Sequence, residues 1–461
     1  MFNVLNAQTK ITRNQKRIIG AAIIGDMLEF FDYFIMGFVL AFIVGPWRLT
    51  FGKSAVILLS AGIGAIFGAT FYGWLADAIG RRKVFMATVI NFSVATGILA
   101  LTPTGAWLFL AFFRFLVGFG VGGLYCVDLP LVQEFVPTAK RGRIGGLVTA
   151  AIPIGLLLGS VLGAYLAPVL GWRGLFATGL IPSLLTLVIR MWVPESPRWL
   201  VEQGRPEEAR KSLAWALEVT PESLPLPERA SVPSKPGFRA LFHHPRSLLA
   251  SWITNIGIQT GYYGLTMWAP TLLVLVLGVP AKRAAFLMIW VGLGGFCGRL
   301  LISTLSDLIG RKLTGGFAAI AAAIFLMLMA IYRSGYVGGV ALFWLLLVIG
   351  YVFADGIFAI LGPYSAEVWP TSLRATGMGS AYGFGGIGKV IGPWGLAVIV
   401  GSSNPVTPAA SLQKLVPSFA YLAGWYLLAA IFYLFVGAET KGRALEEIDR
   451  DLRESKHAAA S

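Results

Sequence analysis

Twelve apolar stretches, each about long enough to cross a lipid bilayer, constrain this sequence more than any other feature. A membrane-spanning helix needs about 20 mostly apolar residues, because the hydrocarbon core is about 30 Å thick. Only 13% of the residues are charged, about half the fraction usual in soluble domains. The sequence therefore predicts an all-α membrane protein with twelve transmembrane helices and argues against a soluble enzyme. The stretches lie near 18–44, 55–76, 84–101, 107–130, 144–170, 174–193, 248–279, 284–305, 315–332, 339–364, 376–400 and 416–436.

One long polar stretch divides these apolar stretches into two groups of six. It is rich in proline and charge, and we expect a short helix within it around Pro206 to Glu218. The domain organisation that follows is a six-helix bundle at 1–193, a linker at 194–247, a second six-helix bundle at 248–440 and a tail at 441–461.

Basic residues concentrate in alternate loops, such as 81–83, 140–143 and 311–312, and in the tail. Cytoplasmic loops of membrane proteins carry an excess of Lys and Arg, so both termini and the linker are expected to be cytoplasmic. This topology accounts for the net charge of +15, and no nucleic-acid partner is expected. We expect a multi-pass protein of the bacterial inner (plasma) membrane, with the basic N-terminus followed by a retained first helix rather than a signal peptide.

Three short motifs occur twice, in the same order relative to the apolar stretches. Residues 73–82 are echoed by 303–312, and the motif from Glu134 to Arg141 is echoed by Glu367 to Arg374. The third pair is 194–198 with 438–442. Three matches in register indicate two homologous halves, a parallel repeat found in one large class of secondary transporters.

These motifs resemble the signatures of the major facilitator superfamily, over essentially the whole chain. The resemblance implies two pseudo-symmetric six-helix bundles, transport by alternating access and no enzymatic activity. It also implies that the loop motifs gate the conformational change: Asp77 would act beside a helix end and a basic pair, and Glu134 with Arg141 and Glu367 with Arg374 would form ion pairs. The gating residues are Gly73, Asp77, Gly80, Arg81, Asp307, Gly310, Arg311, Glu134, Arg141, Glu367 and Arg374.

Two glycine-rich strings, 118–123 and 383–388, satisfy the GxGxxG pattern of dinucleotide-binding proteins. Neither follows a predicted strand, so we interpret them as helix-packing or hinge glycines. The histidines and cysteines form no metal-ligand pattern. We expect no metal and no cofactor, with protons as the coupling ion.

Three acids, Asp26, Glu29 and Asp32, lie within the first apolar stretch. Ionisable groups in a membrane are costly, so they face the protein interior and mark functional sites. We predict that they take up and release protons, with structural pairing of an individual acid as the alternative. At about 100° per residue, Asp26, Glu29 and Tyr33 share one helix face, and Asp32 is displaced from it.

The seventh apolar stretch carries a matching stripe of neutral polar residues: Asn255, Gln259, Tyr262 and Tyr263. With an offset of 230 residues, Gln259 aligns with Glu29 and Tyr263 aligns with Tyr33. We therefore expect the N-terminal half to handle protons and the C-terminal half to hydrogen-bond the substrate. Tyr33 and Asp355 are also expected among the substrate-binding residues.

Lys389 lies within the eleventh apolar stretch, where an ammonium group needs a partner. The candidates are Asp355, in the tenth stretch, or a bound anion. Residues 385–393 resemble the eleventh helix of the aromatic-acid and organic-anion members of the superfamily, which implies that Lys389 engages a substrate carboxylate.

The branch of the superfamily is indicated by further resemblances. Residues 28–33 are similar to the first-helix pattern of metabolite:proton symporters, and 194–200 to a string shared by sugar porters and organic-ion transporters. Thr149 stands where sugar porters carry a sugar-binding Gln. These resemblances imply a monomeric, proton-coupled symporter of a small organic anion, a monocarboxylate or an aromatic carboxylate, in contact with membrane lipid. The alternative is a transporter of a neutral sugar or an organic cation or drug, in which Lys389 is structural.

Overall fold

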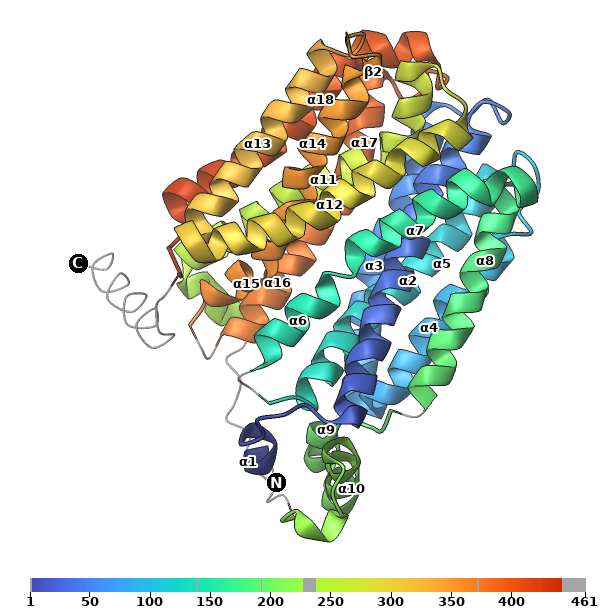
Figure 1. The fold of residues 1–461 in the computed structure, drawn as a ribbon. Coiled ribbons are helices and arrows are strands. Elements are labelled where there is room, and N and C mark those ends of the chain that lie inside the picture. The colour runs from blue at the N-terminus through green and yellow to red at the C-terminus, as the bar shows by residue number, and fades with distance from the viewer. Residues whose placement is uncertain (1, 138–139, 192, 227–237, 371–372, 442–461) are drawn as a thin grey trace. The chain divides into compact units, whose positions relative to one another are not determined.

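The structure is a computed structural model that describes residues 2–137, 140–191, 193–226, 238–370 and 373–441, without the side chains of 124–130, 141–143, 146, 181–191 and 375. It is almost entirely helical (Figure 1). The N-terminal helices are α1 (Phe2–Asn6), α2 (Arg13–Ile43), α3 (Phe51–Ile79), α4 (Arg81–Leu99), α5 (Trp107–Glu134), α6 (Arg141–Thr149), α7 (Ile152–Tyr165) and α8 (Ala167–Met191).

The polar stretch between the halves contains short helices: α9 (Pro197–Glu202), α10 (Pro206–Leu217) and the 3-10 helices η2 (Pro221–Ser223) and η3 (Phe238–His243). The predicted linker helix is therefore confirmed as α10. It begins with proline and two glutamates, which suit a helix N-terminus. At the foot of Figure 1, α1 lies near α9 and α10, and Leu5 of α1 packs against Leu213 and Leu224.

The C-terminal half comprises α11 (Pro245–Leu277), α12 (Ala281–Ile309), α13 (Arg311–Ile331), a hairpin of β1 (Tyr336–Val337) and β2 (Val340–Ala341), α14 (Leu342–Gly356), α15 (Phe358–Glu367), α16 (Arg374–Gly386), α17 (Gly388–Val400), α18 (Pro408–Ile431) and the π-helix η4 (Phe432–Val436). Several spans are broken into two helices, at Ile357 between α14 and α15 and at Ile387 between α16 and α17. Helix breaks inside transporters free polar groups near the substrate path.

Nine helices or joined helix pairs of the described chain are long and apolar enough to cross a membrane, and α5 adds a shorter apolar stretch, Trp107–Gly123. Helix α2 is also long enough to cross a membrane, but it carries the three acids. Helix α8 brings the number of spans to twelve. Each of the twelve predicted stretches thus coincides with a helix or a broken pair, so the twelve-helix fold is confirmed.

The helices group into two compact units, which we describe separately. Unit 1 comprises Met1–Ile35, Ser60–Gly159 and Val169–Val232, and unit 2 comprises Met36–Leu59, Ser160–Pro168 and Pro233–Ser461. Residues 36–59 pack with the C-terminal helices, a feature that the repeat did not suggest. The bundle boundaries expected near 193 and 248 remain a prediction.

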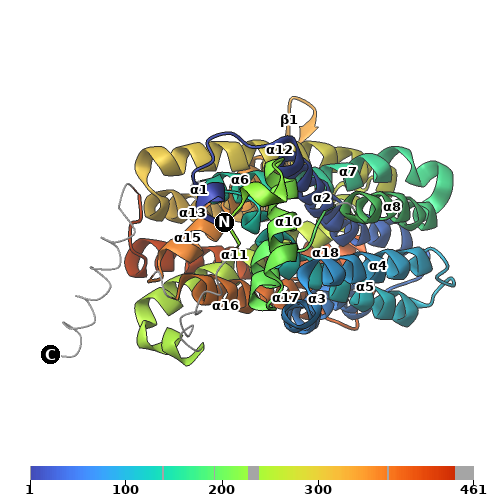
Figure 2. The ribbon, with the colours of Figure 1, turned by 90° about the horizontal axis from the view of Figure 1, so that it is seen from below.

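Small residues allow the helices of unit 1 to approach closely. A Cβ on Gly64 or Gly68 of α3 would overlap the backbone of α5, and one on Gly118 or Gly122 would overlap the backbone of α3. Helices α4 and α5 also lie side by side (Figures 1 and 2). The first glycine-rich string is therefore a helix-packing surface, as expected for a membrane bundle.

The second glycine-rich string does the same in unit 2. Gly388 of α17 lies against Thr260 of α11, and Gly392 lies against Gly264. Gly385 of α16 faces the side chain of Gln259. This packing brings the helix break at Ile387 against the polar stripe of α11.

Candidate functional site

The three acids of α2 are all buried in unit 1: Asp26 is 4% exposed, and Glu29 and Asp32 are each 2% exposed. Asp32 accepts a hydrogen bond from the Thr96 hydroxyl of α4 at 2.6 Å. Its position off the face of Glu29 and Tyr33 therefore directs it toward α4 and α5. None of the three acids faces lipid.

Arg114 of α5 is fully buried and is fixed to the same turn of α2. Its Nη1 donates to the backbone oxygen of Asp32 at 2.8 Å, and its Nη2 donates to that of Tyr33 at 2.9 Å. The guanidinium and the Asp32 carboxylate also attract each other electrostatically. A buried carboxylate beside a buried cation is an arrangement in which gain or loss of one proton changes the local charge balance strongly.

The polar stripe of α11 is buried in unit 2. Asn255 donates through Nδ2 to Ser365 at 2.7 Å and to the backbone oxygen of Ser251 at 2.8 Å. Gln259 is 0% exposed, and within the described residues both polar atoms of its amide lack a hydrogen-bond partner. Because an unpartnered buried amide is costly, it is a candidate ligand-binding group.

Lys389 lies one residue beyond the start of α17, next to the break at Ile387. Its Nζ stands 5.1 Å from the ring centre of Tyr263 and 5.7 Å from that of Tyr382. Aromatic faces stabilise a cation at such distances. The ammonium is thus held beside the polar stripe of α11, and the side chain is half-buried.

Asp355 has a different partner from the one considered in the sequence. Arg299 of α12 donates through Nε to one oxygen of Asp355 at 2.9 Å and through Nη2 to the other at 3.1 Å. The suggestion that Asp355 pairs with Lys389 is therefore corrected: both of its oxygens are engaged by Arg299. The sequence signal for this partner is Arg299 itself, an arginine inside the apolar stretch 284–305.

Tyrosine hydroxyls extend this polar cluster into the stripe of α11. The Tyr351 hydroxyl donates to that of Tyr262 at 2.9 Å and lies 3.0 Å from Thr266 Oγ1. The ring of Phe358 lies beneath the Arg299 guanidinium and contacts the Tyr262 ring. Tyr262 is therefore oriented by its neighbours, while Tyr263, the next residue, faces Lys389.

Two ion pairs among the described residues join one loop motif to another. In unit 1, Arg81 pairs with Glu134, which also accepts a hydrogen bond from Ser196. In unit 2, Arg311 pairs with Glu367. The expected Glu134–Arg141 and Glu367–Arg374 pairs remain predictions, because the Arg141 side chain lies outside the described residues and Arg374 has an interaction of its own.

Burial has an electrostatic effect on Glu134. It raises the pKa of this carboxyl above its ordinary value, although Arg81 and the Ser196 hydroxyl act in the opposite direction. The free-energy cost of removing the carboxylate from water is thus larger than the stabilisation that its partners give to the charged form.

Helices α4 and α13 begin at the same kind of carboxylate cap. Glu195 Oε1 accepts from the backbone nitrogens of Arg81 and Arg82 at 3.0 and 3.1 Å. Glu439 accepts from those of Arg311 and Lys312 at 3.0 and 3.2 Å. Each carboxylate thereby satisfies free N–H groups at the positive end of a helix dipole.

The cap explains the repeated glycines. Gly80 and Gly310 have φ values of +105° and +100°, and a Cβ on either would overlap the capping carboxylate. Asp77 and Asp307 are exposed, and the carboxylates that cap these two helices are Glu195 and Glu439. The gating role of the two aspartates remains a prediction. Gly73 has no heavy atom close to the position of a Cβ.

The sequence model of the family described as "Sugar (and other) transporter" matches residues 18–452. The chain belongs to this family of the major facilitator superfamily, and it is a multi-pass membrane transporter rather than an enzyme. The niacin transporter NiaP of Acinetobacter baylyi is 30% identical over 438 residues, covering 92% of this chain and 94% of that protein.

Two further comparisons extend this finding. The cis,cis-muconate transport protein of the same organism is 29% identical, over 73% of this chain and 75% of that protein. The inward-open structure of the xylose transporter XylE from E. coli superposes with a TM-score of 0.72 at 21% identity, covering 95% of this chain and 99% of that chain. The latter likeness shows the fold alone, and the fold agrees with the twelve-helix architecture.

Proposed function

We propose that this protein is a proton-coupled symporter of a small organic anion, a monocarboxylate or an aromatic carboxylate, that works by alternating access. The observation that carries the proposal is the placement of the Lys389 ammonium over Tyr263, beside a buried Gln259 amide that has no hydrogen-bond partner in the described chain. A carboxylate requires a cation, and an aromatic acid adds a face that stacks on tyrosine.

The relatives support the same class of substrate. Two of them are named as transporters of niacin and muconate. A third, a probable 4-methylmuconolactone transporter of Cupriavidus pinatubonensis, is 28% identical over 94% of this chain. Niacin and muconate are carboxylic acids, so a cationic group is the recognition element that they require.

In the proposed mechanism, Lys389 binds the substrate carboxylate and Gln259 donates to, or accepts from, the rest of the molecule. Asn255, Tyr262 and Tyr263 shape the same site in unit 2. Lys, unlike Arg, presents a point charge without a bidentate fork, so the neighbouring groups supply much of the geometric selection.

Asp32 is the proposed proton carrier among the three acids of α2. It is the one whose carboxylate is hydrogen-bonded to Thr96 and attracted by Arg114. Protonation of Asp32 removes this attraction, while the hydrogen bonds from Arg114 to the backbone oxygens of Asp32 and Tyr33 remain. Asp26 and Glu29 are the alternative carriers. The remaining parts of the proposal are a bacterial inner membrane, cytoplasmic termini and a monomer.

Uptake into proteoliposomes tests the proposal. Labelled nicotinate, benzoate, shikimate and lactate should be offered with and without an inward proton gradient, and we expect the gradient to drive accumulation of at least one. Lys389→Ala should abolish that uptake and Lys389→Arg should retain part of it. The matched control is Lys414→Ala, which removes an exposed lysine of α18.

Two results would contradict the proposal. Full anion uptake by a folded Lys389→Ala variant would remove the anion-binding role of Lys389. Transport of a sugar or a hydrophobic amine, with the whole carboxylate panel inactive, would establish the alternative class of substrate and make Lys389 a structural residue.

A further inference from the structure

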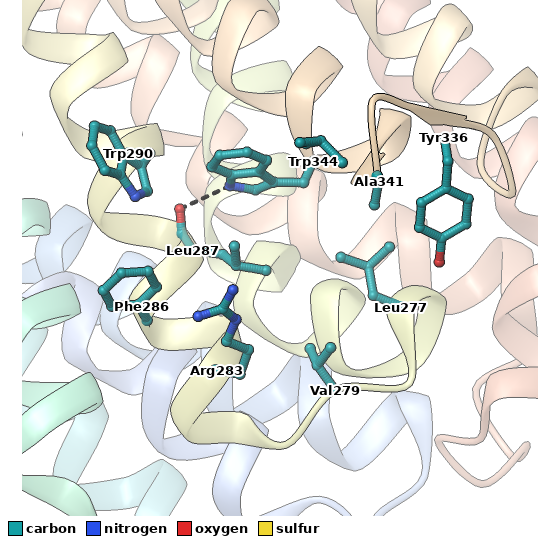
Figure 3. Close-up of a pocket in the computed structure, with 11 residues that line it drawn as sticks. Leu277, Val279, Arg283, Phe286, Leu287, Trp290, Tyr336, Ala341 and Trp344 are labelled. Carbon is teal, nitrogen blue, oxygen red and sulfur yellow. Dashed lines mark hydrogen bonds between the residues drawn. The ribbon is translucent and has the colours of Figure 1, made fainter.

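A pocket of about 440 Å³ lies at the end of unit 2 opposite the Gly310–Glu439 cap. It is formed where α11 ends at Leu277, where α12 begins at Ala281, and where the β1–β2 hairpin leads into α14. Figure 3 shows the Arg283 side chain reaching into it from α12. The proposed transport site uses none of these residues.

The walls of this pocket are apolar and aromatic. Leu277, Leu287, Trp344 and Tyr336 contribute to them. The indole N–H of Trp344 donates to the backbone oxygen of Leu287 at 3.0 Å, which holds the Trp344 ring in place (Figure 3). The pocket therefore has a defined wall with no free hydrogen-bond donor on the Trp344 ring.

One cation stands among these apolar groups. The Arg283 guanidinium lies 5.1 Å from the ring centre of Phe286, and the next turn of α12 carries Trp290, which is 49% exposed. Guanidinium groups match the geometry of phosphate oxygens, and long apolar grooves match alkyl chains. A pocket with both features suits a ligand that is an amphipathic anion.

The position of the pocket along the helices indicates where that anion comes from. Both α11 and α12 are long enough to cross a membrane, so the turn joining them lies near the membrane–water boundary. The hairpin beside it exposes Tyr336, Val337 and Val340. Tyr and Trp are enriched at this boundary, and a guanidinium group there is placed to pair with a lipid phosphate.

We propose that this pocket binds an anionic phospholipid. Its phosphate pairs with Arg283, and part of an acyl chain lies against Phe286, Trp290 and Trp344. The bound lipid fills the space between α12 and the hairpin, and it links the outer ends of α12 and α14. The proposal does not depend on the identity of the transported substrate.

Native mass spectrometry of the purified full-length protein tests the proposal. Phosphatidylglycerol and phosphatidylcholine with identical acyl chains should be added to the detergent-solubilised protein at equal concentrations. We expect one phosphatidylglycerol to remain bound under conditions that release phosphatidylcholine. Arg283→Gln should weaken its binding about tenfold, because one charge-assisted contact is lost.

The chain provides a matched control in Lys282, the adjacent exposed cation that does not line the pocket. Lys282→Gln should leave phosphatidylglycerol binding unchanged. Equal losses in the two variants would overturn the proposal, because they would show attraction by general surface charge. A second variant, Ala341→Phe, fills the pocket and should reduce binding of the same lipid while Arg283 is intact.

The remaining alternative is that the pocket binds a free phosphate compound rather than a lipid. Glycerol 3-phosphate and inorganic phosphate at millimolar concentration should not displace the lipid, since neither supplies an alkyl chain. Displacement by either, or retention of phosphatidylglycerol by both the Arg283→Gln and the Ala341→Phe variants, would overturn the assignment of this pocket to a lipid.

Discussion

Arg299 binds Asp355 through two hydrogen bonds of 2.9 and 3.1 Å, in the buried interior of unit 2, where Asp355 is 0% exposed. The pair joins α12 to the last turn of α14, directly before the break at Ile357. Tyr351 and Tyr262 form their own hydroxyl chain beside it. A fully paired charge thus stands behind the polar stripe of α11 and holds the broken helix in register.

Removal of one partner should be far more costly than removal of both. Arg299→Met leaves the Asp355 carboxylate buried without its cation, and we expect the free energy of unfolding to fall by about 3–5 kcal/mol. The double variant Arg299→Met with Asp355→Leu should recover most of that loss. Thermal unfolding of the purified variants measures both, with Lys414→Gln as the surface control. Equal losses in the single and double variants would contradict this account.

The two carboxylate caps should contribute equally to stability. Glu195→Ala and Glu439→Ala each expose two backbone N–H groups at the start of a helix, and we expect each to lower the free energy of unfolding by about 0.5–2 kcal/mol. Asp77→Ala and Asp307→Ala, which alter the exposed neighbours, should have effects below about 0.5 kcal/mol. Denaturation midpoints compare the four variants; larger losses at the aspartates than at the glutamates would contradict the assignment of the caps to Glu195 and Glu439.

Glu134 should make stability depend on pH in a defined direction. Its pKa is raised in the folded state by burial, so between the ordinary Glu pKa and this raised value the folded protein binds more protons than the unfolded protein. The contribution of Glu134 to the free energy of unfolding therefore falls as the pH rises through that window. On going from pH 8 to pH 5, the melting temperature of the wild type should rise relative to that of Glu134→Gln. If the difference in melting temperature between the two proteins is the same at pH 8 and pH 5, this effect is excluded.

Gln259→Leu should separate binding from stability. The amide has no protein partner within the described residues, so its replacement costs no protein hydrogen bond and should leave the melting temperature equal or higher. The KM for the transported anion should rise about 2- to 10-fold, the value of one hydrogen bond. Concentration-dependent uptake provides the KM. A lower melting temperature with an unchanged KM would make Gln259 a structural residue.

Two loops from the two sequence halves pair within unit 2. Thr50 and Pro405 are opposite each other in an antiparallel bridge flanked by hydrogen bonds from Val406 to Leu49 and from Phe51 to Asn404, each 3.0 Å long. This is a non-hydrogen-bonded pair, in which Cα atoms lie about 4.5 Å apart, within reach of a disulfide.

A cross-link at this bridge should stop transport reversibly. Alternating access requires segments of the two repeats to separate at one end of the protein. In a background without Cys126 and Cys297, the double variant Thr50→Cys with Pro405→Cys should lose more than about nine-tenths of its uptake on oxidation and regain it on reduction. Either single variant is the control, and undiminished uptake by the cross-linked protein would show that the bridge stays closed throughout the cycle.

The spans, the linker helix and the repeat could be predicted from the sequence because their causes are local or periodic. An apolar stretch of about 20 residues has no stable place except a membrane or a large core, and the Pro206 start of α10 is a helix signal in itself. The burial of Asp26, Glu29 and Asp32 followed from the cost of placing a carboxylate against lipid. Each of these arguments needs only residues that are near one another in the chain.

The choice of partners was decided only by the tertiary structure. Arg81 pairs with Glu134, 53 positions away. Arg299 engages both oxygens of Asp355, although the sequence alone also allows Lys389 as the partner of Asp355. The charges in the sequence are compatible with many such pairs, because the sequence does not specify which helices are neighbours. Close packing at Gly385 and Gly388 fixes which helix faces meet α11, and it is this packing that places Lys389 over Tyr263 and beside the polar stripe.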